Sequence, residues 1–175
     1  MIYPDTLEQK LGFDQIRLRL KSYCLSGAAA ARVDAIDFNT SAGHIETQLR
    51  QTLEFRFILE KNETFPSSHF YDAEEWLLKI ALEGNYIDAD QFLKLALALD
   101  TILSIKNFFS KSREVYPELF KLTEPVVITS RLTEQIYQKI DDKAMVRDGA
   151  SPELAKIRKK LREEQSRLRR LADQL

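Results

Sequence analysis

The chain has 175 residues, of which 44% are hydrophobic and 30% are charged, and this near-average composition excludes wholesale disorder. The 26 Lys and Arg against 27 Asp and Glu give a formal net charge of -1, so the chain as a whole is no polycation built for nucleic acid. A single cysteine, Cys24, excludes an intramolecular disulfide framework. No apolar run approaches the ~20 residues of a membrane span. We therefore expect a soluble, cytoplasmic protein with no membrane partner.

Apolar residues recurring at intervals of three and four predict helices along the first part of the chain. The first helix is expected over 6–20, with Thr6 as its N-cap, and a short Ala-rich helix is expected over 28–36 after a corner. A long helix is predicted over 41–61, and Pro66 with two nearby serines marks the next segment as a loop. Alternation typical of strands is hard to find, which favours an all-α fold.

Two further helices are predicted on either side of Gly84. Asp72 and Glu75 have the spacing of a capping box, so a helix is expected to begin at Asp72 and to stop at Gly84. The helix predicted over 88–111 is apolar around most of its circumference, which is typical of a helix at the centre of a bundle. We expect its apolar residues to anchor the fold, among them Leu95, Leu99, Ile102 and Phe109.

The following segment is interrupted by Pro117 and Pro125. A short helix is expected over 118–122, between the two prolines. The β-branched run 125–129 is the one candidate for extended chain, and a helix is expected over 132–140. The fold predicted for the whole chain is an all-α helical bundle.

The last segment differs in kind from the rest. Ser151 is the predicted N-cap of a helix, Pro152 occupies its first position, and no stop signal follows. Apolar residues of this helix fall on the a and d positions of a heptad, with Glu164 as the one polar exception. We predict a helical core domain over 1–150 and a coiled-coil-type arm over 151–175. The apolar seam of the arm consists of Leu154, Ile157, Leu161, Leu168, Leu171 and Leu175.

Such a seam requires a partner helix, and no earlier segment carries a matching heptad. We expect that the chain is a fragment, cut where a longer coiled coil continues. The alternatives are that the seam packs on its own domain or pairs with another copy of the chain.

The arm also carries a local excess of positive charge, with eight basic residues against four acidic ones after residue 150. One interpretation is a basic surface that contacts nucleic-acid phosphates. The other is the solvated outside of a coiled coil, which the spread of the charges and possible i, i+4 pairs such as Lys159 with Glu163 favour. No aromatic residue lies among them, so stacking on single strands is not expected. The candidate contacts are Lys156, Arg158, Lys159, Lys160, Arg162, Arg167, Arg169 and Arg170.

No constellation of residues predicts catalysis. Phosphate-binding, dinucleotide-binding and metalloprotease motifs and paired cysteines are absent from the sequence, and His44 and His69 are isolated. Cys24 is interpreted as a small buried hydrophobic residue. An all-α enzyme is therefore the weakest interpretation, and we expect no catalytic, cofactor-binding or metal-binding residue in this segment.

Two stretches together resemble one family. The first, from Thr6 to Arg17, reads TLEQKLGFDQIR, and the second, from Val146 to Arg158, reads VRDGASPELAKIR. This pair resembles the N-terminal region of bacterial MutS-two, the MutS paralogue that carries an Smr endonuclease domain. The resemblance implies a helical core and a lever that connect an ATPase to a DNA clamp, with the helix from Pro152 as the outgoing lever arm.

The resemblance also implies properties of a longer protein. Relatives of this kind bind ATP and magnesium, form homodimers, cleave DNA, act on branched DNA and suppress homologous recombination, and a role in rescuing collided ribosomes is attributed to them. Their ATPase and nuclease residues would lie beyond residue 175, so this segment is expected to be a non-catalytic scaffold. The alternative is a free-standing helical adaptor that dimerises or binds a partner helix through its heptad.

Overall fold

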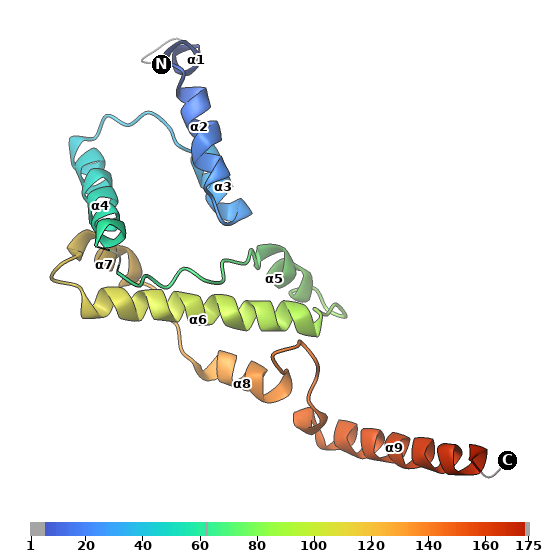
Figure 1. Cartoon of the computed structure of the whole chain (residues 1–175). Coiled ribbons are helices and arrows are strands. Elements are labelled where there is room, and N and C mark those ends of the chain that lie inside the picture. Colours follow the sequence, from blue (N-terminus) through green and yellow to red (C-terminus); the bar gives the residue numbers. More distant parts are fainter. Residues whose placement is uncertain (1–5, 62, 174–175) are drawn as a thin grey trace. The chain divides into compact units, whose positions relative to one another are not determined.

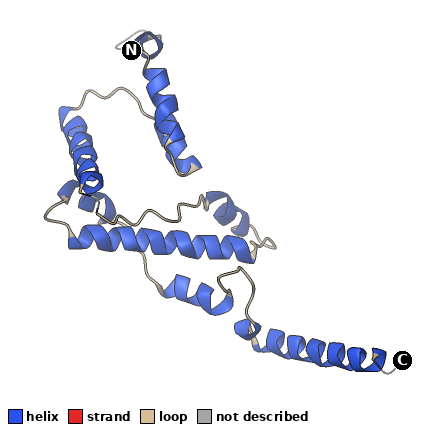
Figure 2. Ribbon diagram, viewed as in Figure 1, coloured by secondary structure: helices blue, strands red, loops and turns tan. Residues whose placement is uncertain are grey.

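The structure is a computed structural model, and it describes residues 6–61 and 63–173. Nine α-helices and one 3₁₀ turn make up this described chain, in which no strand occurs (Figures 1 and 2). The predicted all-α fold is confirmed. The helices belong to two compact units, one from Met1–Glu75 and Ser104–Val127 and the other from Trp76–Leu103 and Ile128–Leu175. Among the described residues, no helix combines the length and the apolar character needed to cross a membrane.

The first unit begins with the short helices α1 (Leu7–Leu11), α2 (Phe13–Ser22) and α3 (Gly27–Asp34). The single helix expected over 6–20 is wrong because Gly12 interrupts it. This glycine has a φ of 70°, a left-handed conformation that ends α1 and redirects the chain into α2. Thr6 makes no side-chain cap, whereas the Ser26 hydroxyl accepts a hydrogen bond from an amide in the first turn of α3.

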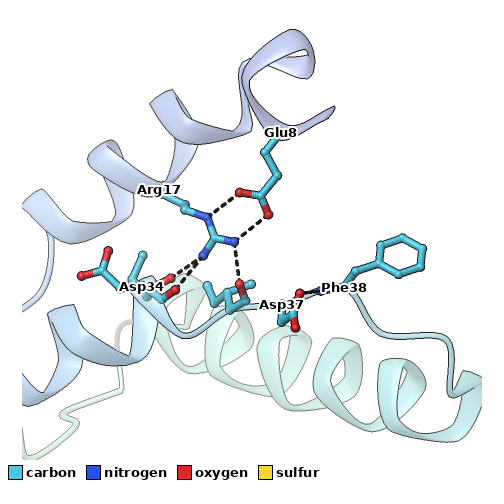
Figure 3. A network of polar contacts seen from close by, with 7 residues as sticks. Glu8, Arg17, Asp34, Asp37 and Phe38 are labelled. Carbon is cyan, nitrogen blue, oxygen red and sulfur yellow. Dashed lines mark hydrogen bonds and ion pairs between the residues drawn. The ribbon is translucent and has the colours of Figure 1, made fainter. Parts of the chain in front are cut away.

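Arg17 on α2 joins the three short helices (Figure 3). Its Nε and Nη2 atoms donate to the two carboxylate oxygens of Glu8 on α1, at 3.2 and 2.7 Å. Its guanidinium also donates to carbonyl oxygens at the end of α3, to Val33 at 2.7 Å and to Ile36 at 2.5 Å. The last carbonyls of a helix lack partners within the helix, so this charged donor stabilises the place where α3 ends.

The core of the first unit lies where α4 (Ala42–Glu60), the end of α6 (Ala89–Lys111) and α7 (Pro117–Thr123) meet. Ile58, Phe109, Tyr116 and Leu119 are buried there. Phe65 from the linker after α4 contacts Phe108 edge to face, with ring centroids 5.5 Å apart. Burial of these large apolar side chains is the main source of stability in this unit.

The start of α7 is capped from α4. The Glu54 carboxylate accepts hydrogen bonds from the amides of Glu118 at 3.1 Å and Leu119 at 2.9 Å. A carboxylate at the amino end of a helix satisfies free N–H groups and complements the helix dipole. The short helix predicted between the two prolines is thus confirmed and tied to its neighbour.

Asp72 does not cap the helix that follows it. That helix, α5 (Glu74–Ile80), begins two residues later and ends before Gly84. The Asp72 carboxylate instead accepts from the amide of Gly27, at the first position of α3, at 2.6 Å. The predicted capping box is therefore wrong, because the carboxylate accepts hydrogen bonds from free N–H groups of a helix that is distant in sequence.

The core of the second unit is formed by the first part of α6 and by α8 (Arg131–Lys139). Ala96, Ile136 and Ile140 are buried in it, and Leu93 and Tyr137 pack against them. The Tyr137 hydroxyl donates to Asp100 Oδ2 at 2.6 Å. Burial, together with this bond to a carboxylate, raises the pKa of Tyr137 to about 12.

The apolar residues of α6 do not all anchor the fold as expected. Phe109 is buried, Leu95 and Leu99 are half-buried, and Ile102 is exposed. A helix with apolar residues all round is thus shared between two small cores and does not occupy the centre of a single bundle. The run 125–129, the one candidate for extended chain, forms no strand.

Candidate interaction surface on the C-terminal helix

A tight hairpin connects α8 to the C-terminal helix. Ile140 and Val146 form an antiparallel bridge, the one such bridge among the described residues. The Asp141 carboxylate accepts from the amides of Lys143 at 2.9 Å and Met145 at 2.8 Å, and these bonds lower the pKa of Asp141. Ala144 closes the turn in a left-handed conformation, with a φ of 59°. This connection is therefore an ordered element, and residues 140–150 are called the arm root below.

Two basic side chains join the arm root to α8. Arg147 Nε donates to the carbonyl oxygens of Tyr137 at 3.0 Å and Ile140 at 3.3 Å, where α8 ends. Lys139 Nζ donates to the carbonyl of Ala150 at 2.6 Å, at the end of the 3₁₀ turn η1 (Asp148–Ala150). Cations at the carboxyl end of a helix bind its free carbonyls and complement its dipole.

The arm is the helix α9 (Pro152–Ala172), which begins where the sequence predicts. The Ser151 hydroxyl accepts from the amide of Leu154 at 3.1 Å, and Pro152 occupies the first position. The 21 residues of α9 extend about 32 Å at 1.5 Å per residue. This helix carries all the candidate contact residues and every seam residue except Leu175, which lies outside the described residues.

Asp148 connects the arm root to the first turns of α9. Arg158 Nη1 donates to Asp148 Oδ1 at 2.7 Å and to the carbonyl of Val146 at 2.7 Å, and Arg162 Nη2 lies 3.0 Å from Asp148 Oδ2. The hydrogen bond from Arg158, supported by the charge of Arg162, holds the pKa of Asp148 below its usual value. Two of the eight candidate contact residues are thus engaged in positioning the arm.

The seam of α9 is uncovered. Ile157, Leu161, Leu168 and Leu171 expose 63%, 56%, 64% and 52% of their surface, and only Leu154, next to the root, is half-buried. Apolar residues in one row on a helix are normally buried against another element. No described residue covers this row, so the seam does not pack on its own unit. A partner from outside the described residues is the remaining expectation.

The other basic residues of α9 point into solvent. The possible pair of Lys159 with Glu163 does not form, and Arg167 lies 3.9 Å from Glu164. Within the described chain the remaining five basic residues have no ion-pair partner. They are Lys156, Lys159, Lys160, Arg169 and Arg170.

Sequence reasoning missed the residues of the arm root. Asp148 and Arg147 belong to the second family-like stretch, and no local pattern marks them as structural. Their partners lie ten residues away along the chain, at Arg158 and Tyr137. A carboxylate just before an N-cap and an arginine two turns into the helix is the signal that could have indicated the ion pair.

The described residues thus form an all-α chain whose C-terminal helix is held at its base and leaves its apolar seam exposed. The chain is similar to endonuclease MutS2, and the predicted resemblance is confirmed. It is 26% identical over 166 residues to the protein of Aquifex aeolicus (strain VF5), covering 95% of this chain and 21% of that protein. It is 27% identical over 161 residues to that of Clostridium beijerinckii (strain ATCC 51743 / NCIMB 8052), covering 91% and 20%. It is 28% identical over 161 residues to that of Thermomicrobium roseum (strain ATCC 27502 / DSM 5159 / P-2), covering 90% and 20%.

The chain thus spans about a fifth of the length of the curated relatives it matches. No family model matches it.

Proposed function

We propose that this chain is the non-catalytic scaffold and lever root of a MutS2-like DNA-binding protein. Its helices would carry the arm α9, and α9 would form one half of a helix pair leading to a clamp. The observation that carries the proposal is the combination of a rooted helix base with a seam that stays uncovered. A helix held in this way can transmit rotation, because packed interiors resist deformation.

The activities of the longer protein form part of the same proposal. We propose an ATP-binding homodimer with endonuclease activity that acts on branched DNA and suppresses homologous recombination, with collided ribosomes as a second client. Among the described residues, no group of three or more His, Cys, Asp or Glu could hold a metal ion. No chemical step is assigned to the residues described here.

The test compares binding of the whole chain to a four-way DNA junction and to plain duplex at two salt concentrations, with sedimentation run in parallel. For a scaffold without recognition of its own, we expect no preference for the junction at either salt concentration. The chain should also sediment as a monomer over the range of the binding assay. The variant Lys159→Ala/Arg170→Ala, which removes two unpaired basic residues of α9, should behave like the unmodified chain.

Either of two results would contradict the proposal. Junction-selective binding with a steep salt dependence, reduced in the double variant, would make α9 a phosphate-contacting surface, since each neutralised phosphate adds about 0.9 to the slope of log affinity against log salt. A dimer that forms through the seam, without affinity for DNA, would favour the free-standing helical adaptor.

A further inference from the structure

The charges beside the seam of α9 are almost all positive. If Leu154 is an a position, Lys160 and Arg167 fall on the g positions along one side of the seam. Arg158, which pairs with Asp148, falls on an e position along the other side, and Arg169 lies at a b position on the same side. Glu153, in the first turn, is the one acidic residue at a described e or g position. In a coiled coil these positions face the flanks of the partner and decide which partner is accepted.

The seam itself contains one acidic side chain. Glu164 occupies a d position in the middle of α9 and is 67% exposed at its side chain. In a parallel pair of identical helices the d positions face each other, so two Glu164 carboxylates would meet inside the interface. Bringing two like charges together away from water is unfavourable.

An antiparallel pair of identical helices is also electrostatically unfavourable. In that arrangement g positions face g positions, so Lys160 and Arg167 of one helix would face the same two residues of the other. Like charges on opposing flanks disfavour pairing. Both orientations of a self-pair therefore carry an electrostatic penalty.

We propose that the seam of α9 receives a helix with an apolar heptad, acidic flanks and a basic residue opposite Glu164, and that it rejects a second copy of itself. The inference rests on the proposed role of α9 as one half of a helix pair, and it does not require DNA binding. Acidic residues on the partner would pair with Lys160 and Arg167, and the basic residue would neutralise Glu164. Charge thus selects the partner, while the leucines supply most of the buried area.

The test uses two designed peptides of three heptads with identical Leu and Ile at a and d and a Lys at the position opposite Glu164. One carries Glu at every e and g position, and the other carries Lys at those positions. Like charges at every e and g position disfavour self-pairing of either peptide, so the two peptides can be compared directly. Fluorescence anisotropy of each labelled peptide with the whole 175-residue chain should show about tenfold tighter binding of the acidic peptide at low salt. The difference in affinity between the two peptides should become smaller at high salt.

Matched variants distinguish the effect of the flanking charges on affinity from the effect of the overall charge of α9. Lys160→Glu/Arg167→Glu should weaken binding of the acidic peptide about tenfold. Lys159→Glu/Arg170→Glu changes the net charge equally on the side of α9 away from the seam, and should change the affinity less than about twofold. Glu164→Leu should convert the chain from a monomer to a self-associating species in sedimentation, because it completes the apolar seam.

Three outcomes would overturn the inference. Equal binding of the two peptides would show that the flanking charges do not select the partner helix. The scaffold proposal would still stand if the chain remained a monomer without affinity for DNA. Dimerisation of the unmodified chain through the seam would contradict this inference and the scaffold proposal together. Displacement of the acidic peptide by plain duplex would show that the flanks are a phosphate-binding surface.

Discussion

The carboxylate of Asp72 lies at the amino end of α3, 45 residues before it in the sequence, and accepts the amide of Gly27 at 2.6 Å. A second, longer bond of 3.4 Å comes from the amide of Ala28. A Cβ atom added at Gly27 would lie 3.0 Å from Asp72 Oδ2. The loop after α4 is thereby tied to the N-terminal helices through one side chain.

Replacing Asp72 with Ala should destabilise α3 by about 1 kcal/mol, because the carboxylate satisfies free N–H groups and complements the helix dipole. Amide hydrogen exchange at Gly27 and Ala28 is the direct measurement, and both amides should lose protection. Glu75→Gln serves as the control, since the predicted cap at this residue is not formed. Unchanged protection in Asp72→Ala would contradict the capping role.

Phe109 is the residue of α6 on which the first core depends, with 4% of its surface exposed. Phe109→Ala should lower the free energy of unfolding by about 3–5 kcal/mol, through lost burial and the cavity left behind. Urea unfolding followed by circular dichroism would measure this loss. Ile102→Ala on the same helix should cost much less because Ile102 is 41% exposed, and equal losses would show that the two positions are not packed differently.

The ion pair of Asp148 with Arg158 should be visible in an acid titration. The pKa of Asp148 in the folded chain lies below its ordinary value of 3.8, so the contribution of the pair is complete above that pH. It is lost as the pH falls through the lower, folded-state pKa. Carbon-13 NMR of the Asp148 carboxyl group should give a midpoint below 3.8, and Arg158→Ala should raise it.

The control for that titration is Lys159→Ala, which removes a neighbouring charge that makes no ion pair with Asp148. Its Asp148 midpoint should stay close to that of the unmodified chain. A midpoint that rises equally in both variants would attribute the shift to the overall charge of α9 and not to the specific contact.

Tyr137 should titrate at a higher pH than an ordinary tyrosine. Its pKa in the folded chain is raised to about 12, so the neutral phenol stabilises the fold fully below pH 10, the ordinary tyrosine value. This contribution is lost as the pH rises through 12. Ultraviolet absorbance of tyrosinate, with Tyr137→Phe as the reference, would identify the late step, and Asp100→Asn should bring it to lower pH. An ordinary midpoint for Tyr137 would contradict its hydrogen bond to Asp100.

Local signals predicted the elements that depend on neighbours in sequence. The α9 start at Ser151 and Pro152 is as expected, because capping chemistry acts within one turn. The long helix expected over 88–111 begins one residue later, at Ala89. The resemblance to MutS2 likewise rests on contiguous stretches, which a sequence shows directly.

The features that the sequence did not predict depend on contacts between residues far apart in the chain or on backbone conformation. Asp72 could not be assigned to α3 from its neighbours, and Gly12 ended a helix because φ there is positive, a property no spacing reveals. Asp148 and Arg147 lie close to their partners only once the hairpin at 140–146 has formed. The candidate contact residues all lie on α9, but which of them are engaged in the root follows from tertiary structure alone.

The joint between α8 and α9 is made largely by arginines that bind main-chain carbonyls. Arg147 binds the carbonyls of Tyr137 and Ile140, and Arg158 binds that of Val146. Every residue type offers the same carbonyl oxygen, so these bonds do not depend on the side chains at the positions they reach. The exit direction of the arm can therefore persist while the surrounding side chains diverge in evolution, provided that the two arginines are retained.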